Sequence, residues 1–262
     1  MRRATILMVW FGLIAVMLFL YAPLLLPLVL AFKDPLTGRS TLANFSAVLS
    51  DSTLLGGLQN SIYLAVVVAV AAPLLGLAAA QAVRTFRVPR IIMTMILLPL
   101  FIPGVSMGVS TGLFFELASI RPSLLTMAIV QTLWALPFSF LIILTAMSGF
   151  DPVYLEAAYT CGANRIQAFR EIELPQIAPG LTGAVTCSAI LSFNETIRTA
   201  VVQGGNTTIQ TFIWSRYQQV GLTPAMHALM SLIIAFTLIL VVILLLAERQ
   251  GEPLSARPEA AD

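Results

Sequence analysis

The stretch from Glu156 to Pro175 reads EAAYTCGANRIQAFREIELP and lies between two long apolar segments. Its charged and helix-forming side chains have no evident use inside a bilayer, so they predict a surface that a partner molecule recognises. The chemistry that these residues can do is docking, through charge pairing and helix packing. The elements around them must therefore hold them outside the membrane.

Two short helices that meet at Gly162 are expected to position these residues. Asp151 can cap the first helix, with Pro152 at its opening position, where a missing N–H costs nothing. Gly162 suits the left-handed residue that ends a helix. Asn164 can cap the second helix, and Pro175 is expected to stop it. The expected apolar faces are Tyr154, Leu155, Ala158 and Tyr159 in the first helix and Ile166, Phe169 and Ile172 in the second.

Seven residues of this stretch follow a fixed spacing over twenty positions. Such a pattern is far less likely to occur by chance than a short pattern such as GxxxG. They resemble the EAA loop of the permeases of bacterial binding-protein-dependent ABC importers. The resemblance implies a type I ABC-importer permease fold, in which the loop 151–176 forms a cytoplasmic coupling helix that docks in a groove of a separate ATPase. The matching positions are Glu156, Ala157, Ala158, Gly162, Ile172, Leu174 and Pro175.

The resemblance also implies a role for each matching residue. Glu156 would pair with a basic group of the ATPase, and Ala157 and Ala158 would stay small so that the first helix fits the groove. Gly162 would provide the turn. An amphipathic helix on the bilayer surface is the alternative, but the segment has more acids than bases and anionic lipid would repel it. The residues that would anchor the loop against the ends of the spans are Ile172, Leu174 and Pro175.

The whole chain is far more apolar than a water-soluble protein. Its 262 residues are 58% hydrophobic and 10% charged, with a mean hydropathy of +0.94, whereas soluble domains carry about 25% charged residues. Apolar runs near the length that crosses a bilayer, about 20 residues, recur along it. We therefore expect an all-α integral membrane protein with a single permease domain and six transmembrane helices. The expected spans are 6–32, 60–83, 91–115, 124–148, 178–200 and 225–247.

Basic residues predict which loops face the cytoplasm. The first apolar run continues to Phe32, too far for a signal peptide, so a retained helix is expected. With the N-terminus inside, six spans place both termini and the loop 151–176 in the cytoplasm, and the basic residues then follow the positive-inside rule. The tail 248–262 is polar, contains proline and is expected to be disordered. The cytoplasmic set is Arg2, Arg3, Arg84, Arg87, Arg90, Arg165, Arg170, Arg249 and Arg257, and the external set is Lys33, Arg39, Arg121 and Arg216.

The third and fifth spans carry residues that are unusual at membrane depth. Glycines in the third span recur every fourth residue and favour close helix packing within the subunit; a place beside the translocation path is the alternative. The fifth span ends in SFNETIRT, where Glu195 and Arg198 are near enough to pair. The other interpretation is that polar groups here line the solute path. The glycines are Gly104, Gly108 and Gly112, and the path candidates are Ser192, Asn194 and Glu195.

Several kinds of active site cannot be built from this sequence. One histidine, two cysteines and scattered acids supply neither a zinc site nor a Ser-His-Asp set, so we expect no catalytic residue and no metal. A phosphate-binding GxxxxGK[ST] loop needs a lysine among glycines, and the only lysine, Lys33, lies in FKDPL. No cofactor is expected on this chain; ATP and Mg would bind to the partner ATPase.

The sequence therefore predicts the multi-pass permease of an ATP-driven importer in a bacterial inner membrane. The resemblance implies a sister permease, two cytosolic ATPase subunits and an extracytoplasmic solute-binding protein, with membrane lipid around the spans and no nucleic acid. Residues 192–195 resemble the Ser-Phe-Asp-Asp region of polyamine-type permeases, with Asn194 in place of the first acid. Polyamine, an opine, phosphonate, iron and sulfate all stay open as solutes. An ion-coupled secondary transporter would need free intramembrane acids, for which Glu195 and Glu116 are the candidates.

Overall fold

The computed structural model describes residues 2–34, 37–86 and 88–251. Within these residues the regular elements are helical, apart from an isolated bridge between Lys33 and Ser40, so the expected all-α class is confirmed for this part of the chain. The chain forms two compact units. The terminal unit contains Met1–Ser52 and Tyr217–Asp262, and the central unit contains Thr53–Arg216.

The terminal unit consists of α1 (Arg2–Ala31), α2 (Ala43–Ser50) and α12 (Pro224–Gly251), with α12 packed against both of the others. The Asn44 amide closes the link between α1 and α2 by donating to the carbonyl oxygens of Ala31 at 2.9 Å and Lys33 at 3.0 Å. Residues 248–251, expected in a disordered tail, instead continue α12, because Glu, Arg and Gln are good helix formers. The rest of that tail lies outside the described residues.

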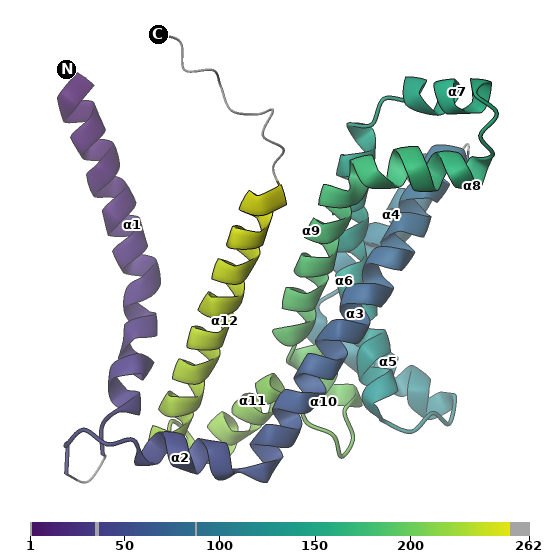
Figure 1. Ribbon diagram of the computed structural model, residues 1–262. Helices are drawn as coiled ribbons and strands as arrows, with labels where there is room; N and C mark the ends of the chain where they lie inside the picture. Colours follow the sequence, from purple (N-terminus) through teal and green to yellow (C-terminus); the bar gives the residue numbers. More distant parts are fainter. Residues whose placement is uncertain (1, 35–36, 87, 252–262) are drawn as a thin grey trace. The chain divides into compact units, whose positions relative to one another are not determined.

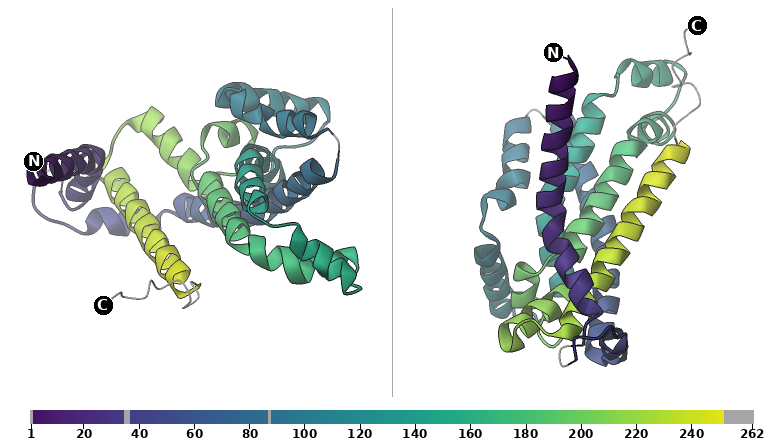
Figure 2. Two further views of the ribbon diagram at one scale, coloured as in Figure 1. Left: turned by 90° about the horizontal axis from the view of Figure 1, so that it is seen from above. Right: turned by 90° about the vertical axis from the view of Figure 1, so that its left-hand side faces the viewer.

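In the central unit, α7 and α8 lie at one end of α9, and α10 lies at its other end (Figure 1). The long helices α3 and α6 run beside α9, and two further views of the chain are given in Figure 2. The elements are α3 (Ser52–Thr85), α4 (Pro89–Leu97), the 3-10 turn η1 (Leu98–Phe101), α5 (Gly104–Leu117), α6 (Leu124–Ser148), α7 (Val153–Thr160), α8 (Arg165–Gln167), the π-helical turn η2 (Ala168–Glu173), α9 (Leu174–Phe193), α10 (Ile197–Val202) and most of α11 (Ile209–Val220).

The core of the central unit is the contact between α6 and α9. Gly180 lies so close to Ala146 that a β-carbon there would collide with the alanine methyl. The buried hydroxyls of Ser139 and Ser188 share a hydrogen bond of 2.6 Å across the same contact. Small residues and paired hydroxyls are how helices associate in lipid, where apolar side chains gain nothing by leaving the solvent.

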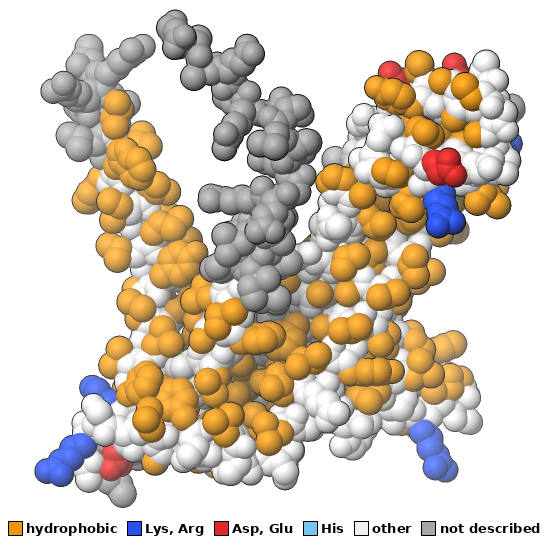
Figure 3. Space-filling model, in the orientation of Figure 1, with side chains coloured by type: hydrophobic (Ala, Val, Ile, Leu, Met, Phe, Trp, Pro, Cys, Tyr) orange, Lys and Arg blue, Asp and Glu red, His pale blue; other side chains and the backbone are white. Residues whose placement is uncertain are grey.

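Hydrophobic side chains cover much of the visible surface along the helices, while the visible charged side chains lie near the helix ends (Figure 3). Among the described residues, four helices are long and apolar enough to cross a membrane, or five if α4–η1 and α5 form one span. The part of α12 whose side chains are described, Pro224–Ile239, is a shorter apolar helix. An integral membrane protein is therefore supported, and the expected count of six spans stays a prediction.

Three expected spans have different boundaries in the structure. The second, 60–83, begins earlier, at Ser52. The third, 91–115, is broken: η1 and α5 are separated at Ile102 and Pro103, and the two parts bend by 104°. Prolines remove the N–H groups that a continuous helix would need here. The fifth, 178–200, begins earlier and ends at Phe193, because residues 194–196 leave the helix before α10 starts.

Candidate functional site

In the first helix of the predicted docking segment, residues 151–176, Pro152 is the N-cap and lies just before the helix rather than at its first position. Asp151 and Gly162 act at the two ends as expected. The Asp151 carboxylate accepts the amide of Val153 at 3.0 Å. At the other end Gly162 has a φ of +87°, and its N–H donates to the Tyr159 carbonyl at 3.0 Å. The N–H of Ala163 donates to the Ala158 carbonyl, also at 3.0 Å. These two bonds form a Schellman motif, which fixes the turn between α7 and α8.

The second helix begins at Asn164, also as expected. The Asn164 side-chain oxygen accepts the amides of Ile166 at 3.0 Å and Gln167 at 2.9 Å. The Gln167 side-chain oxygen accepts the Asn164 amide in return at 3.0 Å. This reciprocal capping box satisfies amides that the first turn of a helix leaves free.

The expected end of that helix at Pro175 is wrong. The helix runs without interruption from Arg165 to Phe193, and Pro175 lies in the first turn of α9. The π-helical turn η2 comes directly before it. Hydrogen bonds that reach five residues back instead of four widen this turn, so the missing N–H of the proline is accommodated.

The same π turn changes which side chains of the segment are buried. Ile166, expected on the apolar face, is 77% exposed. Phe169 and Ile172 are half-buried, and Glu173 is 1% exposed. A turn with an extra residue shifts the helical phase, so the 3.6-residue period no longer predicts the buried face.

Glu173 is the residue of this segment that the sequence analysis missed, since it contributed there only to the excess of acids over bases. Its Oε1 accepts from the Gln81 amide at 2.7 Å, and its Oε2 accepts from the Arg84 guanidinium at 2.8 Å. Arg84 also donates to the Gln81 side-chain oxygen at 2.7 Å. We call these three residues the Glu173 clamp. It ties η2 to the end of α3, and no spacing in the sequence signals it.

The matching residues of the docking segment divide into an outward and an inward group. Glu156 and Ala157 are exposed on α7, as are Gly162 and Pro175. Ala158, Ile172 and Leu174 are half-buried, and Leu174 packs against the cluster that contains Phe140, Ile143 and Ile177. The outward carboxylate and methyl group leave α7 free to contact another surface, while the inward side chains hold the segment to the bundle.

Of the three candidates for a solute path, two are buried. Ser192 donates its hydroxyl to the Gln131 side-chain oxygen at 2.5 Å, and the Gln131 amide donates to the Thr199 hydroxyl at 2.9 Å. Glu195 is 6% exposed, whereas Asn194 is exposed and donates to the carbonyl of Ile190. The structure therefore brings Ser192 and Glu195 into the packing around the break between α9 and α10.

The predicted pairing of Glu195 with Arg198 is confirmed. The two side chains form an ion pair of 2.8 Å, and the Glu195 carboxylate also accepts the Arg198 amide at 2.9 Å. The guanidinium lies 3.8 Å above the Trp134 ring, a cation–π contact that helps to hold a buried charge.

The glycine series of α5 packs against α10 within the same chain, as the packing interpretation predicts. A β-carbon at Gly108 would lie 3.0 Å from the Arg198 Cα, and one at Gly112 would lie 3.0 Å from a Val201 methyl. Gly104 faces the Arg198 guanidinium. The missing side chains therefore let α10 approach α5 closely.

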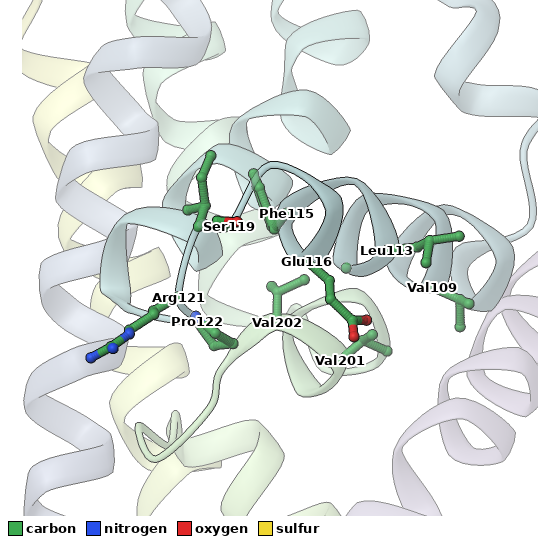
Figure 4. A pocket seen from close by; sticks show the side chains of 11 residues that line it. Val109, Leu113, Phe115, Glu116, Ser119, Arg121, Pro122, Val201 and Val202 are labelled. Atoms are coloured by element: carbon green, nitrogen blue, oxygen red, sulfur yellow. The ribbon is translucent and has the colours of Figure 1, made fainter.

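A hollow of about 740 Å³ lies beside this contact and is lined mainly by apolar residues of α5 and α10. In Figure 4 the Glu116 carboxylate lies beside Val201, and the Arg121 side chain points away from the other labelled residues. The described part of the chain contains no group of three or more His, Cys, Asp or Glu residues that could hold a metal ion.

Apolar helices long enough to cross a bilayer, one pair of them sharply bent, and a capped helical turn at one end of the bundle are typical of membrane transport proteins. Residues 72–251 match the family of binding-protein-dependent transport system inner membrane components. The chain belongs to that family, and it is an inner-membrane permease of an ABC importer. The family is one of transport permeases rather than enzymes.

The individual relatives agree with this assignment. The chain is 26% identical to the spermidine/putrescine transport system permease protein PotC of Escherichia coli (strain K12), over 87% of this chain and 89% of that protein. It is 28% identical to the putrescine transport system permease protein PotI of the same strain, over 82% of each. A bacterial ABC transporter involved in the import of the polysaccharide alginate shares the fold, with a TM-score of 0.70 and 13% identity over 95% of this chain and 96% of that one.

Proposed function

We propose that this permease imports a small polyamine-like or related solute, and that ATP hydrolysis on a separate cytosolic ATPase drives it through the docking segment. The observation that carries the coupling proposal is the geometry of α7. This helix is fixed at both ends by Asp151 and Gly162, and it presents Glu156 and Ala157 to solvent. A rigid, exposed helix with a carboxylate suits docking in a groove with a basic group, because little conformational entropy is lost on binding.

The proposed assembly contains a sister permease, two ATPase subunits and an extracytoplasmic binding protein. ATP and Mg would be bound by the ATPases. The membership of the chain in a binding-protein-dependent family supports this composition. In the proposed topology α1, α3, the bent pair α4–α5, α6, α9 and α12 make six spans of a type I permease, with both termini and the docking segment in the cytoplasm. The arginines at this end, Arg84, Arg90, Arg165 and Arg170, agree with that orientation.

Relatives named for spermidine and putrescine support a polyamine-like solute. We place the path near the break after Phe193, where Ser192, Asn194 and Glu195 supply polar atoms. The Glu195 charge is already neutralised by Arg198, so this site supplies hydrogen bonds rather than a free negative charge. Related solutes, including opines, phosphonate, iron and sulfate, are therefore part of the test.

An ion-coupled secondary transporter is the alternative function, and the structure weakens it. Such a carrier needs an acid in the membrane that is free to gain and lose its partner ion. Of its two candidates, Glu195 is held by Arg198 and by a backbone amide. Glu116 is exposed near the end of α5.

The test is uptake by purified complexes in proteoliposomes. This chain, affinity-tagged in its native host, should recover an ATPase that contains a phosphate-binding loop, identified by mass spectrometry. With the binding protein added outside and ATP inside, labelled putrescine or spermidine should accumulate. Uptake driven by an ion gradient without ATP would contradict the coupling proposal. Uptake of sulfate or phosphonate alone would contradict a polyamine-like solute.

A further inference from the structure

We propose that the Glu173 clamp is the positioning device that makes α3 move together with the docking segment. The inference rests on the proposed function, since it assumes that an ATPase displaces α7. Glu173 would not touch the ATPase or the solute. It would act through Arg84 and Gln81 on the orientation of α3.

The first argument is the burial of Glu173. Its side chain is 2% exposed and lies on the turn that joins α8 to α9, in a segment otherwise rich in exposed charges. A buried carboxylate is tolerated only where its oxygens are paired and hydrogen-bonded. Here both oxygens are used, one by Gln81 and one by Arg84. Separation of η2 from α3 would break both of these contacts at once, so the two elements are held together.

The second argument is the route by which α7 is connected to the spans. A hollow of about 600 Å³ lies beneath the segment, lined by Leu155, Tyr159 and Phe169 together with Arg84 and Glu173. Packing between α7 and the rest of the central unit runs largely through η2. A displacement of α7 therefore reaches η2 first. From η2 the displacement can be transmitted in two ways. One is along the continuous helix into α9, and the other is across the clamp into α3.

The third argument is the position of the clamp on α3. Gln81 and Arg84 lie in the last turns of a 34-residue helix that ends at Thr85. Toward its other end, the Gly57 backbone approaches Thr208, and the Ser61 hydroxyl accepts the Ile209 amide at 2.9 Å. Because α3 is one uninterrupted helix of 34 residues, a tilt at its clamped end also moves its other end. The clamp thus links the docking segment to the opposite end of the central unit by a second route besides α9.

The experiment uses the whole importer in proteoliposomes and a readout that does not require the solute to be known. Gln59→Cys, in a background with Cys161→Ser and Cys187→Ser, places an exposed thiol on α3 at the end opposite the clamp and so reports on the movement of α3. We measure how much ATP and Mg change the rate of its reaction with a thiol reagent, and we measure ATP hydrolysis in the same samples. Glu173→Gln is the test variant, and Glu171→Gln, an exposed acid of the same π turn, is the matched control.

We expect Glu173→Gln and Arg84→Gln each to reduce the ATP-induced change per ATP hydrolysed by roughly 2- to 30-fold, the range for residues that carry coupling between sites. The double variant should lose no more than either single variant, because both act through one contact. Glu171→Gln should respond like the unmodified background. A residue that served only stability would lower the amount of assembled complex and leave this ratio unchanged.

An unchanged ratio in Glu173→Gln, or losses that add in the double variant, would overturn the clamp. Should Arg84→Gln fail to assemble because it leaves the Glu173 charge buried and unpaired, the double variant decides the matter, since it leaves no buried charge. A normal ratio in the double variant would also overturn the clamp. If the unmodified complex showed no response to ATP, the proposed function itself would fail. The two failures are therefore distinguishable.

Discussion

The turn at Gly162 offers the sharpest test of the docking segment. Its φ of +87° is a conformation that side chains with a β-carbon rarely adopt, and a β-carbon added there would meet nothing within 4 Å. A substitution therefore acts through backbone strain alone and not through a clash. We expect Gly162→Val to stop ATP-driven uptake while the chain still inserts in the membrane.

The size of the effect follows from this conformation. A residue with a β-carbon in the left-handed region costs about 1–2 kcal/mol relative to glycine, which shifts the population of the closed turn by roughly 5- to 30-fold at 25 °C. Alanine should show this cost, and valine should exceed it because its branched side chain is less tolerant. Asparagine, which visits this region more readily, should retain the most activity.

The assay compares uptake and ATPase recovery for the three variants with Gly221→Ala as the control. Gly221 has a φ of +72° and also has open space around it, but it lies in the terminal unit. Equal uptake by Gly162→Val and the unmodified chain would refute the role of the turn. So would an asparagine variant as inactive as the valine one, because the harm would then not come from φ.

Three further predictions concern stability, measured by thermal unfolding in detergent. Arg198→Met leaves Glu195 buried without its partner ion and should cost about 3–5 kcal/mol; adding Glu195→Gln should restore part of this, and no restoration would contradict the pairing. Gly108→Ala should lower the stability of the protein by about 1–3 kcal/mol, because the added β-carbon meets the α10 backbone. Gly56→Ala, where the added β-carbon has open space, should not lower it. Equal melting temperatures for the two variants would refute this prediction. Gln131→Leu strands two buried hydroxyls and should cost about 1–3 kcal/mol, and an unchanged melting temperature would show that they find other partners.

The parts of the site that could be predicted from the sequence are those whose partners are near in the chain. Asp151, Gly162 and Asn164 act on groups no more than four residues away, so residue type and spacing were sufficient. The Glu195–Arg198 pair is three residues apart and was found for the same reason.

The parts that could not be predicted depend on distant partners or on a change of helical phase. Glu173 meets Gln81 and Arg84 across 92 and 89 residues of sequence, and nothing in its own neighbourhood distinguishes it from Glu171. The π turn before Pro175 moved the buried face away from Ile166. The glycines of α5 predicted a helix face that allows close packing. The partner of that face, α10, could not be predicted, because it forms only where the preceding helix ends at Phe193.

The continuity of α8, η2 and α9 has a consequence for the surrounding lipid. Twenty-nine residues in one helix extend about 43 Å, whereas the hydrocarbon core is about 30 Å thick, so roughly a third of the rod projects beyond it. A membrane-spanning helix changes its tilt with the thickness of the bilayer, and any tilt of this rod swings the attached docking segment sideways. Acyl-chain length would thereby set the resting position of the surface offered to the ATPase, and the importer would respond to membrane composition without a dedicated lipid site.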